Sequence, residues 1–253
     1  MKPKELTGKV ALITGASKGL GKAMALALAE AGAKLALVSR DEKLLAETAA
    51  AIAAQDAEAG VFPADVSEET QVLALEKAVA ARFGRVHILI NNAGINLRKP
   101  VTEFTLEEWN RIQAVNVTGA FLMCRSFVPH LIGQGYGRIL NMTSMMSHIS
   151  LPGRTAYSTS KAALLGFTKA LALELAPEKS TVNGISPGPC SREINKALME
   201  NAELTQFFLS RIPVGRWGKP EEIGELAVFL CAEAAGFITG TDIIIIDGGW
   251  TAQ

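Results

Sequence analysis

The chain has few of the residues that build disulfide frameworks, metal sites or strongly charged surfaces. Its 253 residues include only three cysteines, Cys124, Cys190 and Cys231, in no spacing typical of a disulfide or a metal site. This predicts a reducing, intracellular compartment and no bound metal. Basic and acidic residues balance at 25 each, so the formal net charge is zero. A protein without net positive charge has no long-range field to attract nucleic acid, which makes a nucleic-acid partner unexpected.

Long hydrophobic runs are also absent. The longest aliphatic run, Ile243–Ile246, is far shorter than the ~20 apolar residues of a membrane helix. The apolar stretch Val10–Ile13 is too short for the core of a signal peptide. We therefore expect a soluble, cytoplasmic protein with no membrane partner.

The residues that are present suit a compact α/β protein. Hydrophobic residues make up 49% of the chain and charged residues 20%, which excludes a disordered or collagen-like chain. The length fits one domain or two small ones. Because no repeat, linker or low-complexity tract interrupts the chain, we predict one domain over residues 1–253.

Short aliphatic runs alternate with longer segments of helical period. The strands are apolar on both faces, as in a parallel sheet covered by helices on both sides. Strand–helix alternation repeated in this way predicts a Rossmann-type, doubly wound parallel sheet of seven strands. The predicted strands are Val10–Thr14, Leu35–Ser39, Val61–Ala64, Ile88–Asn91, Arg138–Thr143, Thr181–Ser186 and Asp242–Ile246. The predicted helices are Leu20–Ala31, Glu42–Ala57, Glu68–Phe83, Leu106–Gly133, Tyr157–Ala176 and Pro220–Cys231.

Two connections are longer than the ~2 to 6 residues usual in such folds. One spans about residues 144–156 and the other about 187–213. Both follow the carboxyl ends of strands, where doubly wound sheets bind their ligands. We therefore expect these two loops to form the substrate pocket.

A glycine motif, Gly15, Gly19 and Gly21, joins the first strand to the first helix. Glycines allow a tight turn and a close approach to a ligand, and the free N–H groups of a helix N-terminus attract a pyrophosphate. This position predicts a dinucleotide site. The alternative is a glycine-rich turn that binds nothing.

The end of the second strand favours one of the two nicotinamide dinucleotides. NAD sites usually place an acidic residue there, whereas this chain has Ser39 and Arg40. Lys18 and Arg40 can instead converge on a 2′-phosphate, so NADP(H) is predicted over NAD(H). The alternative is that both basic side chains are simply solvated.

A candidate acid–base pair lies on the fifth predicted helix. Tyr157 and Lys161 are four residues apart and share one helix face. A nearby positive charge lowers the pKa of a phenol from its usual value of about 10, which suits proton transfer near neutrality. Ser144, at the end of the fifth strand, can hydrogen-bond a substrate oxygen.

Over essentially its full length, the sequence resembles the short-chain dehydrogenase/reductase family. The matching positions occur in the family's order and spacing. They are the glycine motif, Asp65-Val66, Asn91-Asn92-Ala93-Gly94, Asn116, Ser144, Tyr157 with Lys161, Val182-Asn183, Pro187-Gly188 and Asp247-Gly248-Gly249.

The resemblance implies hydride transfer between the cofactor and a carbonyl or secondary alcohol. Tyr157 would exchange the proton, Lys161 would assist it and bind the nicotinamide ribose, Ser144 would polarise the carbonyl, and Asn116 would hold a relay water. The family is usually homotetrameric, with contacts through residues 106–133 and 157–176. The expected cofactor contacts are Gly15, Ser17, Lys18, Gly19, Leu20, Gly21, Ser39, Arg40, Asp65, Val66, Asn92, Ala93, Gly94, Tyr157, Lys161, Pro187, Gly188 and Cys190.

The sequence departs from the family pattern at two places. Arg192 stands where a threonine usually contacts the cofactor, with Ser191 one residue earlier. Either Ser191 can substitute for this threonine, or Arg192 can reach a phosphate or an anionic substrate. His87 stands where the family often has aspartate.

Basic residues near the predicted pocket favour a polar, anionic keto or hydroxy acid or a sugar-derived substrate. The stretch around Arg98 is similar to gluconate 5-dehydrogenases. Two alternatives stay open, a 3-oxoacyl-carrier-protein reductase and a non-catalytic nucleotide-binding scaffold. The candidate substrate residues are Asn96, Arg98, His148, Arg154 and Arg192.

Overall fold

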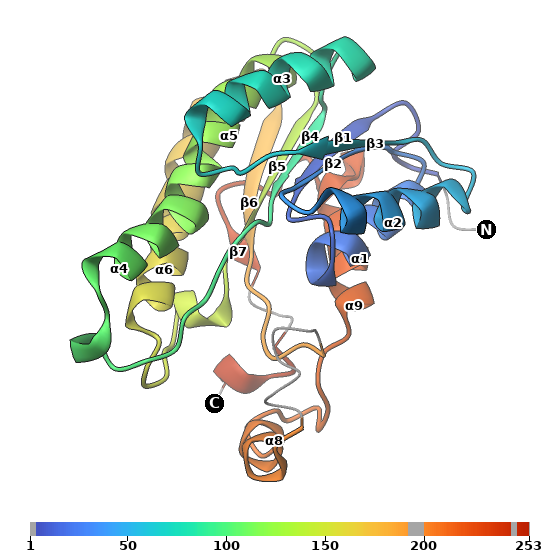
Figure 1. The fold of residues 1–253 in the computed structure, drawn as a ribbon. Coiled ribbons are helices and arrows are strands. Elements are labelled where there is room, and N and C mark those ends of the chain that lie inside the picture. Colours follow the sequence, from blue (N-terminus) through green and yellow to red (C-terminus); the bar gives the residue numbers. More distant parts are fainter. Residues whose placement is uncertain (1–3, 192–199, 244–246, 253) are drawn as a thin grey trace.

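The computed structural model describes residues 4–191, 200–243 and 247–252. Seven parallel strands lie in the order β3-β2-β1-β4-β5-β6-β7, which confirms the predicted Rossmann-type, doubly wound sheet. The sheet belongs to a single α/β domain with helices on both faces (Figure 1). The strands are β1 (Val10–Thr14), β2 (Lys34–Ser39), β3 (Ala59–Pro63), β4 (Ile88–Asn91), β5 (Gly137–Met142), β6 (Ser180–Ile185) and β7 (Asp242–Ile243).

Helices cover both faces of the sheet, as the two-sided apolar strands require (Figure 1). One face carries α1 (Gly19–Glu30), α2 (Glu42–Ala53) and α9 (Pro220–Cys231). The other carries α3 (Glu69–Phe83), α4 (Leu106–Gln113), α5 (Gly119–Leu131) and α6 (Thr155–Leu175). Each face has its own core, with Leu28 and Ile223 fully buried in one and Leu89 and Phe127 in the other. Within the described ranges, no helix is both long and apolar enough to span a bilayer.

The predicted helix Leu106–Gly133 is wrong as a single element. The structure divides it into α4, a π-helical turn at Ala114–Thr118, and α5. Such turns make i→i+5 hydrogen bonds and often occur at functional sites. The turn carries Asn116, whose position in the site depends on it, as shown below.

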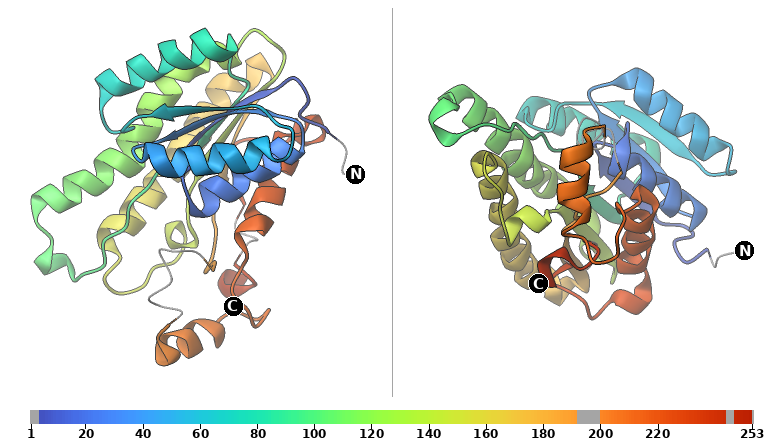
Figure 2. Two further views of the ribbon diagram at one scale, coloured as in Figure 1. Left: turned by 45° about the vertical axis from the view of Figure 1, so that its right-hand side comes forward. Right: turned by 90° about the horizontal axis from the view of Figure 1, so that it is seen from below.

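Other boundaries shift by a few residues. The helix predicted to reach Ala57 ends at Ala53, because Asp56 adopts a left-handed φ of 57° that a helix cannot continue through. Strand β3 begins two residues before the predicted Val61. The long connection after β6 contains α8 (Ala202–Leu209), which lies beyond the carboxyl edge of the sheet (Figure 2). Residues 244–246 of the predicted last strand lie outside the described residues.

The strand order creates a crevice at the end of β1. The chain leaves β1 for β2 on one side, whereas β4 lies on the other side, so the connections diverge at this point. In open α/β sheets, ligands bind at such a switch point, outside the carboxyl ends of the strands. The predicted glycine motif begins directly after β1 and therefore opens into this crevice.

Candidate active site

The turn after β1 has the shape that the glycine motif predicts. Gly15 and Gly19 take φ values of 66° and 57°, in the left-handed region that favours glycine. The turn leads directly into α1, so the free N–H groups of the helix face the crevice. Gly21 does not line the crevice; a Cβ there would collide with the carbonyl oxygen of Gly15. Gly21 therefore serves the close packing of α1 against the turn.

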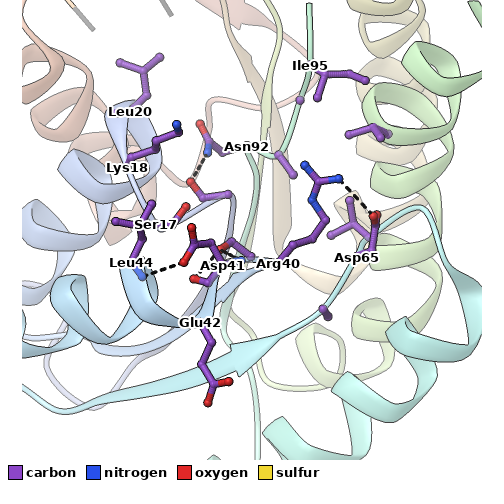
Figure 3. A pocket seen from close by; sticks show the side chains of 18 residues that line it. Ser17, Lys18, Leu20, Arg40, Asp41, Glu42, Leu44, Asp65, Asn92 and Ile95 are labelled. Atoms are coloured by element: carbon purple, nitrogen blue, oxygen red, sulfur yellow. Dashed lines mark hydrogen bonds and ion pairs between the residues drawn. The ribbon is translucent and has the colours of Figure 1, made fainter. Parts of the chain in front are cut away.

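A cavity of about 890 Å³ opens at this turn and accommodates an extended dinucleotide (Figure 3). Most of the predicted cofactor residues line it together, although they come from four separate segments of the chain. They are Gly15, Ser17, Lys18, Gly19, Leu20, Ser39, Arg40, Asp65, Val66, Asn92, Ala93 and Gly94. The lining also includes Asp41, Glu42, Leu44, Ala64, Ile95 and Val115, which sequence reasoning missed although most adjoin predicted residues.

Thr14 connects the ends of the two central strands, β1 and β4, by hydrogen bonds beside this cavity. Its hydroxyl oxygen accepts hydrogen bonds from the backbone N–H groups of Asn92 (2.9 Å) and Ala93 (3.0 Å). In return, the Asn92 amide donates to the carbonyl oxygens of Thr14 (2.9 Å) and Gly15 (3.1 Å). Thr14 was not among the predicted site residues; the available signal was a hydroxyl side chain directly before the first glycine. These bonds hold the β1 and β4 loops together as one wall.

Arg40 and Asp65 face each other at the far end of the cavity (Figure 3). An Arg40 guanidinium nitrogen lies 3.6 Å from an Asp65 carboxylate oxygen. Partial burial alone raises the pKa of Asp65, but hydrogen bonds from Ser67 and the charges of Arg40 and Arg111 outweigh it and lower the pKa. The Asp41 carboxylate accepts the Leu44 N–H at 3.0 Å and so caps α2. One oxygen of the acidic side chain nearest the end of β2 therefore serves the helix cap.

The predicted catalytic side chains Ser144, Tyr157 and Lys161 line one smaller cavity beside the first. Lys161 is buried and donates a 2.6 Å hydrogen bond to the Met142 carbonyl oxygen at the end of β5. Its ammonium nitrogen lies 5.8 Å from the centre of the Tyr157 ring. The Ser144 oxygen accepts the Met146 N–H at 3.2 Å, and this bond does not use its own hydroxyl hydrogen. Ser144 can therefore still donate to a substrate oxygen.

Asn116 reaches this group from the π-helical turn. Its amide oxygen accepts the Ile95 N–H at 2.8 Å, and its amide nitrogen donates to the Ile95 carbonyl (3.0 Å) and to Ser160 (2.9 Å). A Cβ at Gly94 would lie only 3.3 Å from the Asn116 amide oxygen and 3.5 Å from the Lys161 nitrogen. Asn116 thus ties the β4 loop to α6. Ser160 was missed by sequence reasoning, since its partner lies 44 residues away.

A second recess extends from Ser144 and Tyr157 toward α8 and is lined by both polar and apolar residues. Its other polar lining residues come from two loops and are Asn96, Arg98 and Arg154. The amide oxygen of Asn96 is buried and has no hydrogen-bond partner among the described residues. The remaining lining residues are mainly apolar, namely Met145, Met146, Pro187, Gly188, Pro189, Phe208 and Trp217.

Arg154 is a buried cation in this recess, with 9% of its surface exposed. Burial, and then the positive charge of Arg98, lower the pKa of Arg154 to about 10, while Tyr157 acts in the opposite direction. Arg154 therefore keeps its charge at neutral pH. Two neighbouring guanidinium groups beside Tyr157 form a site suited to an anion.

Besides Gly21 and Asn116, two predicted site residues, His148 and Cys190, do not line these cavities. His148 hydrogen-bonds Asp242 at 2.6 Å instead of lining the recess. Cys190 is fully buried in the core and pairs through its backbone with Gly218. Arg192 lies outside the described residues.

Comparison with known proteins decides the family. The family profile described as enoyl-(acyl carrier protein) reductase matches residues 15–251. D-threitol dehydrogenase of Mycolicibacterium smegmatis is 40% identical over 253 residues, covering 98% of this chain and 95% of that protein. The chain belongs to the short-chain dehydrogenase/reductase family. As a member of this family, it is an NAD(P)-dependent oxidoreductase that acts on CH–OH groups.

Further relatives in this family differ in their named substrates. 3-Oxoacyl-(acyl-carrier-protein) reductase FabG of Aquifex aeolicus is 38% identical over 251 residues, covering 97% of this chain and 98% of that one. A gluconate 5-dehydrogenase from Burkholderia cenocepacia, solved in complex with NADP and tartrate, superposes with a TM-score of 0.94 at 34% identity. That alignment covers 99% of this chain and 98% of the other. The short-chain dehydrogenase/reductase fold therefore extends over the whole chain, while the substrate differs among close relatives.

Proposed function

We propose that this chain transfers hydride between NADP(H) and a small keto or hydroxy acid. The observation that carries this proposal is the position of Arg98 and Arg154, which line the same recess as Tyr157 and Ser144. A carboxylate bound by the two guanidinium groups brings the carbonyl or hydroxyl carbon of a short molecule close to Tyr157. Charge-assisted, bidentate pairing gives both affinity and orientation.

In this proposal, Tyr157 transfers the proton and three other side chains support the transfer. The bound nicotinamide supplies or accepts the hydride. Tyr157 gives its phenolic proton to the substrate oxygen in reduction and takes it back in oxidation, while Ser144 donates a hydrogen bond to the same oxygen. Lys161 holds a positive charge beside Tyr157 and the nicotinamide ribose. Asn116 keeps this part of α6 against the β4 loop and holds the relay water.

The adenosine end of the cavity supports NADP(H) over NAD(H). The Arg40 side chain extends into the cavity between the ends of β2 and β3, and Lys18 lies on the turn opposite (Figure 3). One oxygen of the Asp41 carboxylate caps α2. The relative solved with NADP and tartrate is consistent with this preference and with an acidic substrate.

The unpartnered Asn96 amide oxygen adds a preference for a hydroxylated acid. A buried acceptor without a partner costs about 1–3 kcal/mol, and a substrate hydroxyl that donates to it removes this cost. A hydroxylated acid can satisfy Asn96 and the two arginines together.

One observation favours a second candidate, a 3-oxoacyl-(acyl-carrier-protein) reductase. The apolar lining residues Met146, Phe208 and Trp217 suit an acyl chain, and the Aquifex aeolicus relative carries that name. In that case the arginines would bind the phosphate of the carrier's prosthetic arm.

The two candidates are separated by kinetics on paired substrates. D-gluconate and other small hydroxy acids are compared with their primary amides using NADP⁺, on the wild type and Arg154→Gln. We expect at least a tenfold preference in kcat/KM for the acid, and its loss in the variant. Arg82→Gln, which removes an exposed arginine of α3 that pairs with Glu58, serves as the control. Equal rates for acid and amide, with efficient reduction of an acetoacetyl thioester by NADPH, would favour the second candidate.

We also propose a homotetramer built through α5 and α6. Phe121 on α5 and Leu173 on α6 are large apolar side chains that are 45% and 79% exposed in the single chain. Burying such side chains between subunits is favourable. Light scattering tests this, and a monomer at micromolar concentration would contradict it.

A further inference from the structure

One carboxylate on the edge strand binds the turn of Ser144 at both of its ends. Asp242 accepts a 2.6 Å hydrogen bond from the Thr143 hydroxyl, which directly precedes Ser144. The other oxygen of Asp242 lies 2.6 Å from Nε2 of His148, which directly follows the turn Met145–Ser147. Ser186, at the end of β6, also donates to Asp242 at 2.6 Å. Three strand ends therefore meet at one carboxylate.

The surrounding structure makes room for this carboxylate. Asp242 pairs with Gly184 in the β6–β7 register, and a Cβ at Gly184 would collide with the Asp242 carboxylate. The Asp242 side chain is only 9% exposed, and a buried charge needs hydrogen-bond donors around it. Thr143, Ser186 and His148 supply these donors. The glycine and the donors together indicate a built arrangement of side chains.

The arrangement does not suit nucleophilic catalysis. A catalytic triad needs histidine between the hydroxyl and the carboxylate, whereas here the carboxylate lies between His148 and the two hydroxyls. The Thr143 and Ser186 hydroxyls both donate directly to the Asp242 carboxylate, with no histidine between them and it. The hydrogen bonds of Asp242 instead hold the backbone on both sides of Ser144 in place.

The turn Met145–Ser147 connects the anchored His148 to Ser144 through short-range hydrogen bonds. The Ser147 N–H bonds the Ser144 carbonyl (2.8 Å) and the His148 N–H bonds the Met145 carbonyl (3.0 Å), so the turn is a small hydrogen-bonded unit. The Ser144 hydroxyl oxygen also accepts the Met146 N–H within it. Fixing His148 and Thr143 therefore fixes the direction of the Ser144 hydroxyl.

We propose that His148 and Asp242 are positioning residues that aim Ser144 at the substrate oxygen. This inference rests on the proposed role of Ser144 in the reaction. A misplacement of about 1 Å can cost a hundredfold in rate, so even a modest loosening of the turn is measurable.

The test compares two variants of His148. His148→Leu removes the hydrogen bond, whereas His148→Gln keeps a donor at nearly the same distance from the backbone. We expect kcat for D-gluconate oxidation with NADP⁺ to fall at least tenfold in the Leu variant and to stay within about threefold of wild type in the Gln variant, with KM for NADP⁺ unchanged in both. Exchange of the backbone amide hydrogens at positions 146 and 148 should accelerate in the Leu variant and not in the Gln variant.

Two further variants distinguish a loss of Ser144 positioning from a general loss of folding. Thr143→Val removes the anchor at the other end of the turn at equal volume and should also lower kcat. His130→Leu removes a similar histidine–carboxylate contact, the 2.7 Å bond to Glu76 between α3 and α5, and should leave kcat unchanged. Equal losses in the Leu and Gln variants of His148, or wild-type kcat and exchange in His148→Leu, would overturn the proposal.

Ser144→Ala separates this inference from the function on which it rests. If Ser144→Ala abolishes turnover while His148→Leu does not lower it, the positioning role alone is wrong. If Ser144→Ala turns over at the wild-type rate, the proposed role of Ser144 fails, and the inference fails with it.

Discussion

The ammonium group of Lys161 lies 5.8 Å from the centre of the Tyr157 ring while donating a 2.6 Å hydrogen bond to the carbonyl oxygen of Met142. Only 4% of Lys161 is exposed, so its long side chain is held in one position. Met142 ends β5, two residues before Ser144. The same strand end therefore places both the hydroxyl of Ser144 and the charge of Lys161 next to Tyr157.

The first prediction concerns cofactor choice. Arg40→Ala should weaken NADPH binding more than tenfold, because a charge-assisted contact to a 2′-phosphate contributes about 1.5–3 kcal/mol. NADH binding should change less than threefold, since NADH has no such phosphate. Fluorescence titration with both nucleotides measures the two affinities.

A control variant accompanies the cofactor titration. Arg82→Ala removes an arginine of similar exposure that pairs with Glu58 away from the cavity, and both affinities should stay as in the wild type. If Arg40→Ala weakens NADPH and NADH equally, Arg40 acts through its contact with Asp65 and the assignment of the 2′-phosphate site is wrong.

The second prediction concerns Asn116, which has a structural role besides the catalytic role that we propose for it. Asn116→Ala leaves the backbone N–H and carbonyl of Ile95 without their side-chain partner and removes one of the hydrogen bonds of Ser160, at a cost of about 1–3 kcal/mol. For a chain of this size, that lowers the melting temperature by roughly 2–4 °C for each kcal/mol. Thermal unfolding with and without NADPH measures it. An unchanged melting temperature would show that the π-helical turn does not depend on this side chain.

The third prediction concerns the pH dependence of stability at His87. Burial, with the charges of Lys9 and Arg85, lowers the pKa of His87, and its Nδ1 accepts the Val10 N–H at 3.1 Å. The folded state therefore binds a proton less readily than the unfolded state. The stabilisation is complete above the unfolded pKa of about 6.5 and is lost as the pH falls below it.

Replacing His87 should remove part of this dependence. In His87→Gln, the difference in melting temperature between pH 7.5 and pH 5.0 should be smaller than in the wild type. His130→Gln, at a histidine that bonds Glu76, provides the comparison. An identical pH dependence in His87→Gln and the wild type would exclude His87 as its source.

Much of the site was predictable because strand ends converge. Predicting that β1, β4 and β5 are buried parallel strands is enough to bring the glycine turn, Asn92 and Ser144 to one edge of the sheet. The helical spacing of Tyr157 and Lys161 then places both on one face of α6. These inferences need only local patterns and the rules of the fold.

Other parts of the site depend on contacts that no local pattern records. The π-helical turn around Asn116 has the same apolar period as a continuous helix, so the predicted helix runs through it. His148 bonds Asp242, 94 residues away on an edge strand, and this contact turns it away from the recess that its loop helps to form. The proximity of Arg98 and Arg154 likewise joins two loops that are distant in the chain.

The central claim is that Tyr157 of this chain transfers the proton. The most direct test measures kcat for hydroxy-acid oxidation with NADP⁺, together with NADPH affinity, in the wild type and Tyr157→Phe. Loss of a positioned acid–base group costs about 10²–10⁴-fold, so we predict a fall in kcat of at least a hundredfold with NADPH affinity within about threefold of wild type. A Tyr157→Phe enzyme that binds NADPH normally and keeps more than a tenth of the wild-type kcat would contradict the account.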